Sequence, residues 1–203
     1  MDSTRQTKIS APLFWAYSLE KYSLDEVKTA CLKLQDDHAY NVNLLLFCML
    51  CDSHGANLSK EQLASIRQDI LLSDETLLEH RVKRKKAKPL ADSPNSQTND
   101  ELYHRLLQEE LTLEAAQQEL IIASFMKRLD ASEQIEVMNN EVGISQQSDA
   151  SIITQQGGAS SLMQSDGSSA LKLYFELMIT SEQASSAFKE QQEKFIRVLG
   201  KHV

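Results

Sequence analysis

Apolar residues recur every three or four positions along most of this chain, which is the period of an α-helix. A clear example is the stripe formed by Val27, Ala30, Cys31 and Leu34. Gly and Pro, which tight turns and sheet corners need, number only 6 and 3 among the 203 residues. The pattern therefore predicts an all-α fold.

Several positions carry the residues that begin or end helices. Asn41 or Asn43 is suited to cap a helix N-terminus, Gly55 to end that helix, and Ser73 to begin a short helix. Pairs with capping-box spacing, in which each side chain bonds a free backbone N–H of the first turn, are Ser23–Glu26, Ser59–Gln62, Thr98–Glu101 and Thr180–Gln183.

The run Leu44–Cys51 is apolar on all sides, which predicts a central helix covered by others. A strand is the less favoured alternative because the run has no β-branched residue. The run is also far shorter than the roughly 20 residues that span a bilayer.

The longest predicted helix follows Thr98 and reaches about Leu129. We expect its glutamates Glu109, Glu110, Glu114 and Glu119 to form a solvent-exposed face. Its apolar stripe is predicted from leucines seven apart and their neighbours, namely Leu102, Leu106, Leu107, Leu111, Leu113, Leu120 and Phe125.

Three segments follow from these patterns, and together they make a compact multi-helix bundle with additions. Residues 10–135 form the helical core, in which Lys88–Gln97 is a connecting linker with two prolines. Residues 139–169 are rich in Ser, Gln and Gly and are expected to be a flexible linker. Residues 170–201 form a C-terminal helix pair, which must dock on the bundle, on itself or on a partner to bury its apolar face.

Composition narrows the classes of function. The formal net charge of −8 disfavours wholesale binding to nucleic acid or to an anionic membrane. Three cysteines and a polar N-terminus argue against a secreted disulfide framework, so a cytoplasmic protein is expected. We expect no cofactor.

Cys48, Cys51 and His54 lie three residues apart, and Cys31 or His38 can supply a fourth zinc ligand. The surrounding run is helical and apolar, however, and a buried free cysteine behaves as a small hydrophobic residue. We interpret the thiols as core residues and expect no metal site.

Asp36 and Asp37 resemble the start of an aspartate-rich cation site, but Asn41 stands where that motif needs a third carboxylate. Solvated carboxylates at a helix end are the favoured interpretation. A basic run follows later, with Arg81, Lys83, Arg84, Lys85, Lys86 and Lys88. It is interpreted as an exposed helix end, with contact to a protein or a nucleic acid as the alternative.

The chain resembles an uncharacterised bacterial family described only as a domain of unknown function. Its pattern F-W-x-[FY]-S-L-x-x-Y is matched by Phe14–Tyr22, and L-Q-D followed by [DN]-V-N-L-L-L-F is matched by Leu34–Asp36 and Asn41–Phe47. The tryptophan that closes the pattern is replaced here by Leu50 or Cys51. The resemblance covers about residues 10–130 and implies a small helical cytoplasmic protein, with no activity to transfer.

Two interpretations of the polar residues in this segment remain open. Gln35, Asp36, Asn41 and Asn43 either cap and brace helices or form, with Trp15, the floor of a ligand pocket. The favoured function is a non-enzymatic protein-interaction module with an unidentified partner, and self-association stays open. Alternatives are a ligand-binding or catalytic protein that uses this pocket, and a nucleic-acid contact through Arg81–Lys88. No catalytic residue is assigned.

Overall fold

The computed structural model describes residues 9–91, 97–144, 169–178 and 186–203. Over these ranges the chain folds into helices without a strand, which confirms the predicted all-α class. The helices are α1 (Ala11–Tyr22), α2 (Asp25–His38), α3 (Val42–Ser53), α4 (Lys60–Asp69), α5 (Leu71–Ala91), α6 (Gln97–Ile144), α7 (Ala170–Met178) and α8 (Ser186–Gly200).

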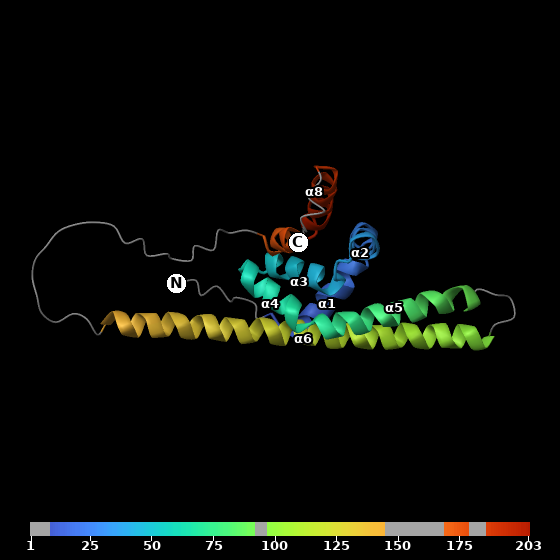
Figure 1. The fold of residues 1–203 in the computed structure, drawn as a ribbon, viewed down its shortest axis with the longest axis horizontal. Helices are drawn as coiled ribbons and strands as arrows, with labels where there is room; N and C mark the ends of the chain where they lie inside the picture. Colours follow the sequence, from blue (N-terminus) through green and yellow to red (C-terminus); the bar gives the residue numbers. More distant parts are fainter. Residues whose placement is uncertain (1–8, 92–96, 145–168, 179–185) are drawn as a thin grey trace, which may run out of the picture.

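The long helix α6 runs along one side of the molecule and supports the rest (Figure 1). Helix α5 lies antiparallel beside its first half, and α1, α3 and α4 pack over its middle. Helix α7 covers the side of α3 that faces away from α6, and α8 packs on α2. No helix within the described ranges is both long and apolar enough to cross a membrane.

Helix α3 is the centre of the bundle, as the sequence predicts. Every residue from Val42 to Cys51 is buried. The side chain of Asn41 caps the helix by accepting a hydrogen bond of 2.9 Å from the backbone N–H of Leu44. After the helix, Gly55 takes a φ of 63°, a left-handed conformation that glycine adopts readily.

The predicted capping boxes have different outcomes. Ser59 and Gln62 form the reciprocal pair at the start of α4, as expected. Ser23 does not cap α2: Leu24 is the N-cap, and the Ser23 hydroxyl donates to the Glu20 carbonyl at the end of α1. Thr98 lies inside α6, which begins at Gln97, and Thr180–Gln183 lie outside the described residues.

Helices α5 and α6 are both longer than predicted. Helix α5 begins at Leu71 rather than Ser73 and continues to Ala91, so Lys88–Ala91 are helical and not a linker. The ion pairs of Arg81 and Arg84 with Glu110 tie the middle of α5 to α6. Helix α6 continues past Leu129 to Ile144, which includes the first residues of the predicted 139–169 linker. Residues 145–168 of that segment lie outside the described residues.

The predicted leucine stripe of α6 is wrong in part. Leu111 and Leu120 are 43% and 48% exposed, whereas Gln117 and Gln118 are almost completely buried. Polar residues can occupy this inner face because other helices supply their hydrogen-bond partners. Phe125, another residue of the predicted stripe, is buried against Phe47.

The C-terminal helices dock on the bundle and on each other. Leu171, Tyr174 and Phe175 are buried. The carboxylate of Asp52, at the end of α3, accepts hydrogen bonds from the backbone N–H groups of Ala170 and Leu171 at 2.6 and 3.2 Å. Asp52 thus caps α7 from a different part of the chain.

Candidate binding cleft

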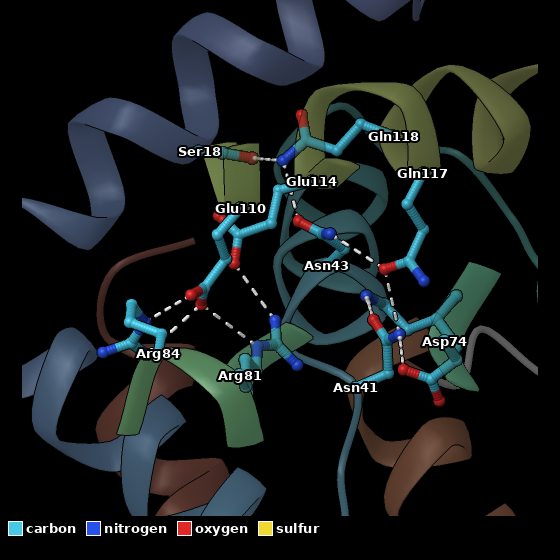
Figure 2. Close-up of polar contacts among 11 residues, drawn as sticks. Ser18, Asn41, Asn43, Asp74, Arg81, Arg84, Glu110, Glu114, Gln117 and Gln118 are labelled. Atoms are coloured by element: carbon cyan, nitrogen blue, oxygen red, sulfur yellow. Dashed lines mark hydrogen bonds and ion pairs between the residues drawn. The ribbon is translucent and has the colours of Figure 1, made fainter. Parts of the chain in front are cut away.

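A cluster of amide side chains joins α3 to α6 at the centre of the molecule (Figure 2). Gln118 donates to the Oδ1 of Asn43 at 2.9 Å, and Asn43 donates to the Oε1 of Gln117 at 2.9 Å. Asn41 donates to the same oxygen at 3.0 Å and to Asp74 of α5 at 2.8 Å. We call Asn41, Asn43, Gln117 and Gln118 the amide cluster.

The amide cluster leaves one acceptor unused at its α1 end. The Nε2 group of Gln118 donates to Ser18 as well as to Asn43, but its Oε1 has no hydrogen-bond partner among the described residues. Gln118 is only 3% exposed. A buried carbonyl oxygen without a donor costs free energy, which any group that supplied a hydrogen-bond donor to it would recover.

An ion-pair network joins α5 to α6 beside the cluster (Figure 2). Arg81 donates to Glu110 at 3.4 Å and to Glu114 at 3.0 Å, and Arg84 binds both oxygens of Glu110. Burial raises the pKa of Glu114 despite its contact with Arg81. The bond to Glu110 raises the pKa of Arg84.

This network corrects two predictions from the sequence. Glu110 is 8% exposed and Glu114 is partly buried, so they do not belong to a solvated face; only Glu109 and Glu119 are exposed. The basic run is not a free helix end either, because Arg81 and Arg84 lie against these glutamates and Lys85 pairs with Asp36. Lys83, Lys86 and Lys88 are exposed.

A cleft of about 500 Å³ opens between the α5–α6 hairpin and helices α1 and α2. Its floor contains Asn43 and Gln118 of the amide cluster, its walls are mainly apolar, and lysines stand among its lining residues. The lining is Trp15, Ser18, Leu19 and Tyr22 from α1; Lys28, Leu32 and Gln35 from α2; Val42, Asn43 and Leu46 from α3; Arg84 and Lys88 from α5; and Leu107, Glu110, Leu111, Glu114 and Gln118 from α6.

The structure divides the five residues proposed from the sequence as a pocket. Trp15, Gln35 and Asn43 line the cleft. Asn41 lies behind it in the closed amide cluster, where its backbone N–H also donates to the Tyr174 hydroxyl at 3.0 Å. Asp36 is on the surface, where a hydrogen bond from Lys85 lowers its pKa.

Sequence reasoning missed Gln118, Lys28 and the two glutamates as lining residues. The only local signal was the Gln117–Gln118 pair, which interrupts a leucine-rich helix at the point where α3 crosses it. The partners of these residues are far away in the chain, and helical periodicity gives no information about them.

The cysteines are buried, as predicted. Cys31, Cys48 and Cys51 are all free thiols in the core, and burial raises the pKa of Cys31 to about 12. The pKa values of Cys48 and Cys51 are raised for the same reason, which opposes formation of a reactive thiolate. Within the described residues no group of three His, Cys, Asp or Glu side chains is placed to hold a metal ion.

Residues 13–121 match the model of a family described as protein of unknown function, DUF2390. The chain belongs to DUF2390. The match includes every residue that lines the cleft, which extends from Trp15 to Gln118, and it ends before α7 and α8. The cleft is therefore part of the DUF2390 region of the chain. No curated protein and no solved structure matches the chain significantly.

Proposed function

We propose that this DUF2390 protein binds a small molecule in the cleft between the α5–α6 hairpin and helices α1 and α2. One observation carries the proposal: the cleft joins apolar walls to a buried amide floor that has an unused acceptor, the Oε1 of Gln118. Ligand sites in proteins are typically apolar cavities of roughly 300–1,000 Å³ with a few placed polar groups, and the cleft fits this description.

The geometry favours binding over catalysis. A general acid or base needs a group that is free to exchange a proton with the substrate. Both carboxylates in the lining are engaged, Glu110 by Arg81 and Arg84, and Glu114 by Arg81. We therefore propose a non-enzymatic role for these residues, in which Glu110 holds α5 against α6 and both glutamates shape the cleft.

Trp15 provides a direct test because it is the only tryptophan of the chain and lines the cleft. The probes are N-phenyl-1-naphthylamine, which is neutral, and 8-anilinonaphthalene-1-sulfonate, which has the same ring system and one negative charge. Binding of either probe should quench Trp15 emission by energy transfer and raise the melting temperature. We expect saturable quenching by at least one of them.

A matched pair of variants localises the signal. Leu107→Trp would narrow the lined cleft and should weaken binding, whereas Leu72→Trp changes a side chain that is 77% exposed on α5 and outside the lining. Calorimetric titration of the two variants avoids interference from the added tryptophan. Absence of binding by both probes, or equal binding by both variants, would contradict the proposed function.

A protein partner is the second candidate, and the outer face of α5 favours it. Leu71, Leu78 and Val82 recur at spacings of seven and four along this helix and are 39%, 62% and 44% exposed. A helix face of this kind is suited to pack against another helix. If it joins two copies of the chain, Leu78→Glu will convert a dimer to a monomer in sedimentation velocity runs, and a monomeric wild type would contradict self-association.

Nucleic-acid binding receives less support. Three of the cations in the run from Arg81 to Lys88 are already engaged with carboxylates, namely Arg81, Arg84 and Lys85. Each phosphate contact by these residues would require breaking an existing ion pair, so the run offers fewer cations for counterion release than its sequence implies.

A further inference from the structure

We propose that the ligand of this cleft is a small amphiphile with an apolar body and a single anionic group. This inference rests on the proposed function and adds the charge and polarity of the ligand. The distribution of charged and apolar side chains around the cleft supports it.

The charges of the α5–α6 ion-pair network beside the cleft balance one another. Glu110 and Glu114 are matched by Arg81 and Arg84, through contacts of 3.0 Å for Arg81–Glu114 and 3.4 Å for Arg81–Glu110. These four groups leave no net charge, so a ligand meets little electrostatic preference from the network itself.

Two lysines break this balance. Lys28 of α2 and Lys88 of α5 both line the cleft, both are exposed, and neither makes an ion pair within the described residues. They stand on different helices, so the opening receives two positive charges that the fold has not neutralised. In a chain with a net charge of −8, this local excess of cations gives the cleft a preference for one anionic group.

The remaining walls require an apolar body. Trp15, Leu19, Leu32 and Leu111 contribute apolar surface to the lining, and the last three are 54%, 37% and 43% exposed. Covering this surface is favourable by roughly 25 cal/mol per Å² removed from water. A small polar anion such as inorganic phosphate would leave these side chains in water and is not expected to bind.

The two anilinonaphthalene probes differ by one sulfonate and therefore test the charge preference. We expect 8-anilinonaphthalene-1-sulfonate to bind about tenfold more tightly than N-phenyl-1-naphthylamine in low salt, since two lysines act on one anion at the protein surface. The preference should shrink in about 1 M salt, where charges are screened within roughly 3 Å.

Lysine variants identify the groups responsible. Lys88→Gln and Lys28→Gln should each reduce affinity for the sulfonate probe about threefold and leave the neutral probe unchanged. Lys86→Gln is the control, since it removes an exposed lysine of α5 that does not line the cleft. Dodecanoate should displace the sulfonate probe at about tenfold lower concentration than dodecanol does.

Each outcome has a distinct meaning. Equal affinity for the two probes overturns the inference about charge but leaves small-molecule binding in place, whereas no binding by either probe defeats both. A membrane lipid headgroup is tested with phosphatidylglycerol vesicles, and we expect the protein to remain in the supernatant after sedimentation. Sedimentation with the vesicles that is abolished by Lys88→Gln would overturn the proposal in favour of a membrane surface.

Discussion

Asn41 connects four segments of the chain through one residue. Its Oδ1 caps α3, its Nδ2 donates to Asp74 and Gln117, and its backbone N–H donates to Tyr174 of α7. It is 5% exposed, so loss of these bonds is not compensated by water. The core, the α5–α6 hairpin and the C-terminal helices therefore meet at Asn41.

Asn41→Ala is expected to lower the free energy of unfolding by about 2–4 kcal/mol. Loss of the cap costs about 1 kcal/mol, and leaving its buried hydrogen-bond partners unpaired costs about 1–3 kcal/mol. Urea unfolding measures the change. Asn57→Ala is the control, since this residue is exposed in the loop before α4 and should change stability by less than about 0.5 kcal/mol. Equal effects of the two substitutions would contradict the role assigned to Asn41.

The buried polar side chains are the part of the core that the sequence does not predict. The sequence predicts Leu44–Cys51 as the central helix because a run that is apolar on all sides must be covered by other helices, and it predicts Asn41 or Asn43 as the cap. It does not predict the inward orientation of Gln117, Gln118 and Glu110, since polar side chains enter a core only when distant residues satisfy them. Those partners are Asn43, Arg81 and Arg84, and no local pattern connects them to α6.

Two glutamates four residues apart on α6 have different roles in the packing of α5 against α6. Glu110 lies between Arg81 and Arg84, and its side chain is 10% exposed. Glu114 contacts Arg81 alone, and its side chain is 28% exposed. The first therefore holds α5 on α6, while burial opposes ionisation of the second.

We expect Glu110→Gln and Glu114→Gln to change stability in opposite directions near pH 7. The first should lower the free energy of unfolding by about 3 kcal/mol, because it removes the carboxylate that buried Arg81 and partly buried Arg84 share. In the wild-type protein, the pKa of Glu114 is higher in the folded state than in the unfolded state. Wild-type stability is therefore lost as pH rises from the unfolded pKa of about 4.3 through the folded value. Glu114→Gln should remove this loss and leave the variant more stable than wild type.

Chemical unfolding of both variants between about pH 4 and pH 8 measures the difference. The advantage of Glu114→Gln should shrink towards the acidic end, as Glu114 becomes protonated in both states. If Glu114→Gln is instead less stable than wild type at neutral pH, the ion pair with Arg81 outweighs burial, and the expected sign of the effect is wrong.

The C-terminal helices α7 and α8 pack on the helical bundle, although the family match ends before them. Tyr174 is fully buried and its ring packs edge-on against Tyr40, whose hydroxyl accepts from Gln192 of α8 at 2.6 Å. Sequence reasoning identifies the apolar face of these helices but leaves three docking partners open. The choice depends on Asp52 and Asn41, which lie more than a hundred residues earlier in the chain.

Asp52→Ala is expected to loosen α7 without unfolding the bundle, since it removes the carboxylate that caps the helix. Loss of a cap costs about 0.5–2 kcal/mol, which corresponds to amide exchange in α7 that is roughly 2- to 30-fold faster. Hydrogen–deuterium exchange of Leu171–Phe175 measures this change. Asp37→Ala, on the exposed end of α2, is the control and should leave these amides unchanged.

In the proposed function, a small molecule binds in the cleft against Trp15, Asn43 and Gln118. Side-chain NMR during a titration with 8-anilinonaphthalene-1-sulfonate observes these three groups individually. We predict saturable shifts of the Trp15 indole N–H and of the Asn43 and Gln118 side-chain amides, while the Asn57 amide stays fixed. Shifts confined to the outer face of α5, or no shifts at all, would contradict binding in the cleft.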